Sequence, residues 1–289
     1  MAAGDSRWSL DATTLLPKLR ERAEHAVRCG ALEPIATACE VVPESGIEFQ
    51  VRQATNLVRK QTIVRQRPPN FDPFLPYESD LYVGDAGPAH AVLFNKFNVL
   101  DDHLLIVTRE FEHQDRPLNA GDFAALATCW EALDGLAFYN CGVISGASQR
   151  HKHLQLVPGL GPGTKRAPIE DVLDMDTGRA EGFAFQHAVA GLSVADVSAI
   201  DAGREMAAVY DSLMAATLAT GGAYNLLATK DWMMVVPRAE EHSGRTSINA
   251  LGFAGSLFVR DVSELEEIRR RGPLETLADV TRAGALPRR

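Results

Sequence analysis

The spacing of apolar side chains along the chain predicts several helices. Three stretches carry apolar residues at helical intervals, and a fourth is a charged helical segment: 11–29, 119–138, 203–219 and 262–272. In the second stretch, Leu126, Trp130 and Leu133 form one stripe, and Asn119 precedes it as a cap. Residues 67–80 and 159–182 are rich in turn-forming residues, so we expect extended or loop structure there.

Runs of apolar residues, several of them alternating with polar ones, predict strands between these helices. The runs are "IEFQVRQ" (47–53), "HAVLFNKFNV" (90–99), "HLLIVTREF" (103–111), the short "CGVI" (141–144), "HKHLQLVP" (151–158), two within "AYNLLATKDWMMVVP" (223–237), and "GFAGSLFV" (252–259). Asp101 and Asp102 separate the second and third runs, which predicts an antiparallel hairpin. Hairpins interleaved with single helices indicate an α+β fold with a mainly antiparallel sheet.

Composition and charge narrow the class of protein. The chain has 289 residues, 46% of them hydrophobic, and a formal net charge of -9, which argues against general binding to nucleic acid or membranes. An anionic small molecule remains compatible, because a few basic groups can line a pocket. The four cysteines form no C-x-x-C pair and we see no signal peptide or membrane span, so we expect a cytoplasmic protein.

The segment "SGASQRHKHLQL" (145–156) carries the strongest candidate chemistry. On a strand, side chains alternate, so His151, His153 and Gln155 share one face while Lys152 and Leu154 take the other. Exposed histidines on a solvated sheet face are one explanation of this pattern. A zinc site is a second, but zinc requires three or four ligands, Gln155 is a poor one, and the next carboxylate is Glu170. We therefore predict that His151, His153 and Gln155 do not form a metal site.

A third explanation is nucleophilic catalysis on phosphorus. A neutral imidazole can attack a phosphoryl centre when its other nitrogen keeps its proton on a fixed acceptor. The preceding loop suits this chemistry, because Gly146 lets backbone amides approach closely and Ser145, Ser148 and Gln149 supply neutral donors.

The same segment resembles the active-site region of the diadenosine tetraphosphate phosphorylases, also called ATP adenylyltransferases. These enzymes belong to the histidine triad superfamily, on the branch shared with galactose-1-phosphate uridylyltransferase, where His-x-His-x-Gln replaces His-x-His-x-His. Further blocks match in the same order, and together they cover most of residues 47–260: "FDPFLPYESDLYVGD", "LFNKFNVLDDHLLIVTREFEHQDRPL", "AFYNCGVISGASQRHKHLQL", "YNLLATKDWMMVVPR" and "INALGFAGSLFV".

The resemblance implies a histidine-triad-like catalytic region over 1–180 and a C-terminal region over 181–289 that completes the substrate cleft. It implies reversible phosphorolysis of diadenosine tetraphosphate to ATP and ADP through a covalent AMP-histidine, with His153 as the nucleophile and His151 ordering the site. Gln155 would hold an oxygen of the AMP group, and because glutamine cannot activate water, transfer to phosphate is favoured over hydrolysis.

Substrate contacts also follow from the resemblance. They fall on Lys60, Asn95, Lys96, Asn140, Gly146, Ala147, Ser148, Gln149, Asn249, Ala250, Leu251, Ser256 and Arg260. Ala250 and Leu251 stand where the family commonly has small polar residues and a threonine, which leaves backbone contacts there. Ser256 and Arg260 replace a usual methionine and lysine.

The implied partners are nucleotides and phosphate, with no protein partner. A polyphosphate needs positive charge, which Lys60, Lys96 and Arg260 would supply. A divalent ion, Mg²⁺ above all, would arrive with the polyphosphate rather than sit in a protein cage. Two alternatives remain: a phosphorylase or nucleotidyltransferase acting on another nucleotide, such as a sugar nucleotide, and a catalytically silent nucleotide-binding protein. The presence of His153 argues against the latter.

Overall fold

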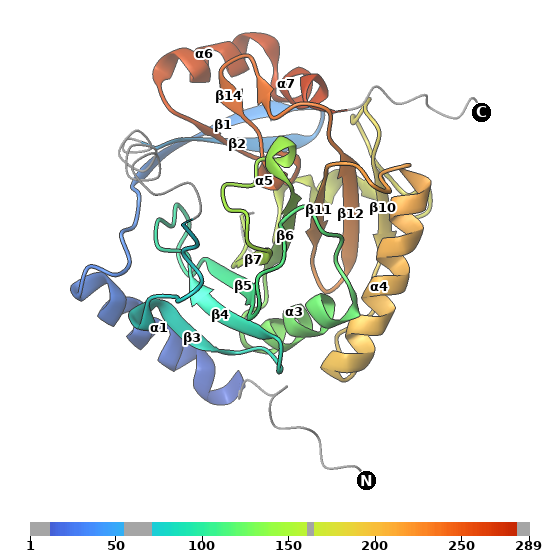
Figure 1. Cartoon of the computed structure of the whole chain (residues 1–289). Helices are drawn as coiled ribbons and strands as arrows, with labels where there is room; N and C mark the ends of the chain where they lie inside the picture. The colour runs from blue at the N-terminus through green and yellow to red at the C-terminus, as the bar shows by residue number, and fades with distance from the viewer. Residues whose placement is uncertain (1–11, 55–70, 161–164, 282–289) are drawn as a thin grey trace.

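The computed structural model describes residues 12–54, 71–160 and 165–281, and its largest element is an eight-stranded sheet (Figure 1). Neighbouring strands pair antiparallel throughout. This confirms the predicted α+β class. In order across the sheet, the strands are β10 (Ala188–Gly191), β12 (Trp232–Pro237), β11 (Tyr224–Ala228), β6 (Leu136–Cys141), β7 (His153–Val157), β5 (Leu104–Thr108), β4 (His90–Phe94) and β3 (Tyr82–Asp85).

Helices cover one face of this sheet. The core on that face contains buried side chains from α1 (Ala12–Arg28), α3 (Ala120–Ala132) and α4 (Ala199–Ala216). Leu154 and Leu156 of β7 point into this core, as the alternation predicted. Lys152 is also buried on this side, where its Nζ lies 2.7 Å from a carboxylate oxygen of Asp122 in α3. The opposite face of β7 is thereby left to His153 and Gln155.

A smaller sheet and the C-terminal helices pack over part of the other face. Strand β2 (Ile47–Ala54) pairs antiparallel with β1 (Thr37–Glu44) and parallel with β15 (Ser256–Val259). In Figure 1 these strands lie beside α6 (Val262–Arg271) and α7 (Pro273–Asp279), above the short α5 (Ala250–Phe253). The large sheet takes β10, β11 and β12 from beyond residue 180, so both sequence regions contribute strands to it.

Several predicted boundaries are wrong. The helix predicted for 119–138 ends at Ala132, and Leu136–Cys141 forms β6 at the centre of the sheet. The turn between them needs Gly135, because a Cβ there would lie 2.1 Å from the carbonyl oxygen of Val157. Of the "CGVI" run, only Cys141 is in a strand, and Val143–Ser145 forms a 3-10 turn.

At the C-terminal side two more elements differ from the prediction. Helix α4 begins at Ala199, earlier than predicted, because Ser198 caps it through a hydrogen bond from the backbone N–H of Asp201. The run 252–259 is a strand only over Ser256–Val259. No helix within the described ranges is long and apolar enough to cross a membrane.

Candidate active site

A cavity of about 580 Å³ opens on the face of the large sheet opposite α3. That volume is typical of a small-molecule site. Most of the predicted residues line it: Asn95, Lys96, Asn140, Gly146, Ser148, Gln149, His153, Gln155, Asn249, Leu251, Ser256 and Arg260. Three others, His151, Ala147 and Ala250, do not line it, and Lys60 lies outside the described residues. Predicted positions spread over more than 160 residues of the chain therefore come together at one cavity.

His153 begins β7 and presents one ring nitrogen to the cavity. Its Nδ1 lies 2.7 Å from the carbonyl oxygen of His151, so Nδ1 carries the proton and donates it, which leaves Nε2 with the lone pair. The side chain is buried, and burial lowers the pKa of His153 to about 4. The ring of Phe74 contacts it, with centroids 5.3 Å apart. His153 is therefore a neutral imidazole at pH 7 with an available nucleophilic nitrogen.

Gln114 fixes the backbone of His153. The backbone N–H of His153 donates to Gln114 Oε1 at 2.8 Å, and Gln114 Nε2 donates to the carbonyls of His153 and Asn140. This buried amide joins β7 to β6 beside His153 and Asn140, which both line the cavity. The sequence analysis missed it, although "EHQDRPL" lies within a matched block.

His151 acts through its backbone rather than at the cavity. Its Nδ1 lies 2.9 Å from a carboxylate oxygen of Asp72, and its Nε2 lies 2.8 Å from the carbonyl oxygen of Thr108. The ring is 1% exposed and held from both sides, so its carbonyl is a fixed acceptor for His153. The expected ordering role fits this geometry, but His151 is a positioning residue, since it does not line the cavity.

A short hydrogen-bond chain sets the orientation of Gln155. Asn95 Nδ2 lies 3.2 Å from His103 Nδ1, and His103 Nε2 lies 3.0 Å from Gln155 Oε1. An imidazole that accepts at Nδ1 carries its proton on Nε2 and donates it to that amide oxygen. The NH₂ group of Gln155 is then the part that faces a ligand, which suits an anionic one. His103 was not among the predicted residues.

Two of the three cations expected at the cavity, Lys96 and Arg260, line it and are paired with carboxylates. Lys96 Nζ lies 2.8 Å from Glu78, and Arg260 Nε lies 2.7 Å from Glu264. Each cation would therefore have to leave its carboxylate partner before it could bind a phosphate oxygen. Arg245, which the prediction omitted, also lines the cavity and lies 3.2 Å from Asp261.

The loop between β6 and β7 is built from buried polar contacts. Asn140 Oδ1 accepts from Asn225 Nδ2 at 2.8 Å and from the backbone N–H of Ala250 at 2.9 Å. Gly146 adopts a positive φ of 85°, and a Cβ there would come within 3.0 Å of Ile248 and Asn249. Only glycine therefore lets the loop approach the C-terminal segment so closely.

Arg238 is the buried cation that holds this loop. Its guanidinium donates to the carbonyl of Ser145 at 3.3 Å, to Asn225 Oδ1 at 2.5 Å and to the carbonyl of Glu240 at 2.8 Å. Burial lowers the pKa of Arg238 to about 10, against the opposing effect of the Glu241 carboxylate, so the guanidinium stays protonated at pH 7. Its charge lies directly behind the loop that lines the cavity.

The C-terminal segment reaches the cavity through Asn249, Leu251 and Ser256. The backbone N–H of Ala250 is taken by Asn140, and that of Leu251 by Asn249 Oδ1 at 3.0 Å. The backbone contacts to substrate expected at Ala250 and Leu251 therefore cannot use these N–H groups. Asn249 itself caps α5, and Leu251 gives the cavity an apolar surface. Ser256 Oγ is buried at the cavity without a hydrogen-bond partner in the described structure.

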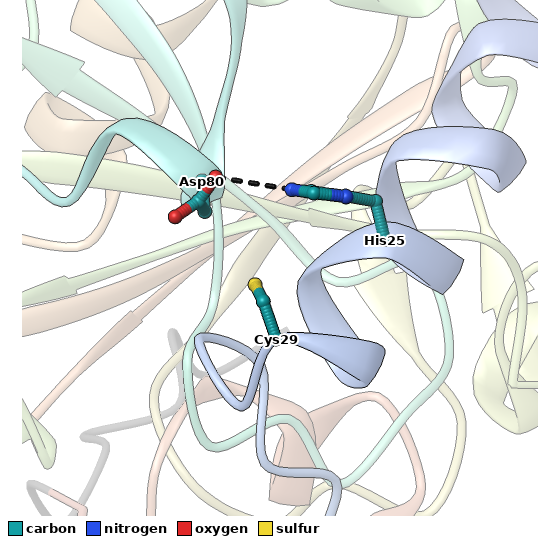
Figure 2. Close-up of side chains that lie close together, drawn as sticks. All are labelled: His25, Cys29 and Asp80. Carbon is teal, nitrogen blue, oxygen red and sulfur yellow. Dashed lines mark hydrogen bonds and ion pairs between the residues drawn. The ribbon is translucent and has the colours of Figure 1, made fainter.

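Two carboxylates line the cavity within the described residues. The carboxylates that line it, Glu78 and Glu264, are both paired with cations. Such a cavity suits an ion that arrives with phosphate oxygens as ligands. Within the described residues, three metal-ligating side chains come together elsewhere, at His25, Cys29 and Asp80, none of which lines the cavity (Figure 2).

Comparisons with known proteins give matches over most of the chain. The family model of the Ap4A phosphorylase N-terminal domain matches residues 5–175, and that of the ATP adenylyltransferase C-terminal domain matches residues 181–283. Diadenosine 5',5'''-P1,P4-tetraphosphate phosphorylase 2 of Saccharomyces cerevisiae is 32% identical over 238 residues, covering 68% of this chain and 71% of the relative. Protein APA1 of the same yeast is 27% identical over 268 residues, covering 80% of this chain and 82% of the relative.

Solved structures of the yeast enzyme share the fold. The structure of yeast Ap4A phosphorylase Apa2 in complex with Ap4A superposes with a TM-score of 0.77 at 27% identity, covering 93% of this chain and 97% of that one. The structure of the same yeast enzyme in complex with AMP superposes with a TM-score of 0.78 at 26% identity, covering 95% of this chain and 98% of that one. The sequence matches and the fold together show that the chain belongs to the Ap4A phosphorylase family, with its N-terminal Ap4A phosphorylase and C-terminal ATP adenylyltransferase domains.

Proposed function

We propose that the protein is an ATP adenylyltransferase that catalyses the reversible phosphorolysis of diadenosine tetraphosphate, with inorganic phosphate as the second substrate and ATP and ADP as products. The observation that carries this proposal is the neutral His153 imidazole, with Nδ1 held by the His151 carbonyl and Nε2 at the cavity beside the amide of Gln155. Relatives named for this reaction and a complex with Ap4A support it.

The first step forms a bond from His153 to phosphorus. The Nε2 lone pair attacks an α-phosphorus of the dinucleotide, the bond from that phosphorus to the bridging oxygen breaks, and ATP leaves with the electron pair. The imidazole becomes positively charged as the bond forms. Its Nδ1–H already donates to the His151 carbonyl, which stabilises that charge without a proton transfer.

The second step transfers the AMP group to phosphate. An oxygen of inorganic phosphate attacks the same phosphorus, the P–N bond to His153 breaks, ADP is released, and the neutral imidazole returns. The amide NH₂ of Gln155, oriented by His103, donates to a non-bridging oxygen in both steps. Because neither Gln155 nor the His153 adduct can act as a general base toward water, phosphate is the favoured acceptor.

Electrostatics and shape support a nucleotide ligand. Apolar and aromatic side chains from 71–81 and 93–99 line part of the cavity, which suits a planar base. The polar loop residues and the buried Arg238 behind them suit the phosphates. A divalent cation, Mg²⁺ in the simplest case, would neutralise part of the polyphosphate charge, and Lys96 and Arg260 would exchange their carboxylate partners for phosphate oxygens.

A labelling experiment tests the proposal. The protein is incubated with diadenosine tetraphosphate labelled at the α-phosphorus, without inorganic phosphate, and an acid-labile, base-stable AMP adduct is expected. His153→Ala should abolish labelling, whereas His242→Ala, which changes another histidine of the cavity, should keep it. Absence of label, or equal labelling of the His153 variant, contradicts the mechanism. Release of a sugar 1-phosphate from a sugar nucleotide at a higher rate would instead favour the alternative substrate class.

We further propose that the protein works in the cytoplasm. Its four cysteines are free thiols, two exposed and two buried, which suits a reducing compartment. Fractionation of the source cells with an antibody against the chain tests this, and recovery in an oxidising compartment would contradict it.

A further inference from the structure

Three metal-ligating side chains meet on the surface at the end of the first helix. His25 lies in the last turns of α1, and Cys29 follows one turn later, directly after the helix ends at Arg28. Asp80 lies in the 3-10 turn Ser79–Leu81, more than fifty residues further along the chain. Figure 2 shows the His25 ring directed at Asp80, with the Cys29 thiol on the same side. We propose that His25, Cys29 and Asp80 bind a zinc-class divalent cation.

The distances suit tetrahedral coordination. One ligand atom from each residue lies within 4.8 Å of the other two, and His25 Nε2 is already 3.1 Å from Asp80 Oδ1. Ligands about 2.0 to 2.3 Å from a tetrahedral ion lie roughly 3.3 to 3.8 Å from one another. All three residues are exposed, so small rotations of their side chains bring the thiol into range without moving buried atoms.

The chemistry of the ligands selects the class of ion. A thiolate and an imidazole prefer zinc, cobalt and related ions over Mg²⁺ or Ca²⁺, which prefer oxygen. Three protein ligands leave the fourth position to water. On binding, the Cys29 thiol loses its proton to solvent as the metal–sulfur bond forms, and its weak contact to the carbonyl of Ala26 at 3.5 Å is released.

The end of the helix also favours a cation there. The backbone N–H of Cys29 still bonds to the carbonyl of His25, so the thiol lies at the C-terminal end of the helix dipole, where positive charge is stabilised. Asp80 adds a formal negative charge. The nearby Arg28 is directed to Glu24, 3.8 Å away along the helix, and is not paired with Asp80.

A bound ion would tie two segments that both reach the wall of the cavity. Asp80 follows Glu78, the partner of Lys96, by two residues. The chain leaving α1 is anchored nearby, where the N–H of Glu33 donates to the carbonyl of Lys96 at 2.8 Å. The metal site is separate from the cavity, so binding can be measured without substrate and independently of the proposed reaction.

Cobalt titration of the metal-free, full-length protein tests the proposal. We expect the intense visible bands of tetrahedral cobalt together with a thiolate-to-cobalt charge-transfer band, both saturating at one ion per chain and displaced by zinc. Cys29→Ser should remove the charge-transfer band, and His25→Ala or Asp80→Asn should weaken binding at least about tenfold. Cys39→Ser is the matched control, because Cys39 is also an exposed free thiol, and it should behave like the unchanged protein.

Thermal unfolding gives a second measurement. Zinc should raise the Tm of the unchanged protein and of Cys39→Ser, because an ion that binds only the folded state stabilises it, and should leave Cys29→Ser unaffected. The proposal is overturned if no cobalt–thiolate band develops, if the band persists in Cys29→Ser, or if zinc shifts the Tm of all three proteins equally.

Discussion

The ring of Phe74 shields His153 from water, so shortening Phe74 is expected to change the pH dependence of adduct formation. The two ring centroids lie 5.3 Å apart and Phe74 is itself buried. Burial is the main cause that lowers the pKa of His153 to about 4, because it disfavours the charged imidazolium. Phe74→Ala admits water beside the imidazole and is expected to raise the pKa of His153 towards the ordinary value of about 6.5.

The size of the effect follows from the fraction of neutral imidazole. At pH 5.5, a group with a pKa of about 4 is about 97% neutral, whereas one with a pKa of about 6.5 is about 9% neutral. The unchanged protein should therefore keep nearly its full rate at that pH. The Phe74→Ala variant should lose up to about tenfold relative to its own rate at pH 8.

Single-turnover labelling at subsaturating diadenosine tetraphosphate measures this, because such rates report the pKa of the free enzyme. Inorganic phosphate is left out, since it titrates in the same range, whereas the internal phosphates of the dinucleotide do not. Phe111→Ala is the control: Phe111 contacts the ring of His151 at 5.3 Å but makes no ring contact with His153. The reasoning is refuted if the unchanged protein already loses most of its rate by pH 5.5, or if both variants shift alike.

Four further predictions rest on other contacts. His103→Phe should lower the labelling rate about tenfold by releasing the amide of Gln155, and a double-mutant cycle with Gln155→Ala should show that the two losses do not multiply. Gln155→His should raise AMP release relative to ADP, because an imidazole can activate water; an unchanged product ratio would count against the role of that amide. Arg238→Met should lower the free energy of unfolding in urea by at least about 2 kcal/mol, because buried carbonyls lose their donors, whereas Arg204→Met on the surface should change it by about 0.5 kcal/mol or less. Burial lowers the pKa of His187 to about 4, so the neutral ring stabilises the folded protein fully above about pH 6.5. As the pH falls towards 4, the free energy of unfolding should therefore drop by up to about 3 kcal/mol. His187→Gln should make that drop smaller.

Local patterns predicted the parts of the fold that local forces determine. The hairpin of β4 and β5 was found because both strands are apolar runs that flank a polar turn. The start of α3 was found because Asn119, a favourable cap, precedes the apolar stripe, and the structure shows that it forms a capping box with Asp122. The end of α3 was missed because "LAFYNC" is buried at every position, so it shows no alternation. Only the close approach of Gly135 to β7 shows where the helix must stop.

The charged residues of the cavity show a second limit of prediction from sequence. Arg260 and Glu264 are four residues apart across the start of α6, so their pairing is a local contact. Lys96 and Glu78 are eighteen residues apart on either side of two strands, and their pairing depends on how that chain segment folds back. A matched block therefore identifies a cation at the cavity but not whether the cation is free.

Asn140 shows the same limit of prediction from sequence, at the loop proposed to bind phosphate. The resemblance placed this residue at the phosphate loop, and it does line the cavity, but its side-chain oxygen is occupied by groups 85 and 110 residues away in the chain. One of them, the Asn225 side chain, is in turn held by Arg238, which also donates to the carbonyl of Ser145 inside the loop. The loop shape thus depends on a buried cation that directly follows β12, as well as on the loop's own Gly146. Substitution of Asn225 should consequently impair the reaction without removing any contact to substrate, because Asn140 and Ser145 would each lose one of the donors that fix them.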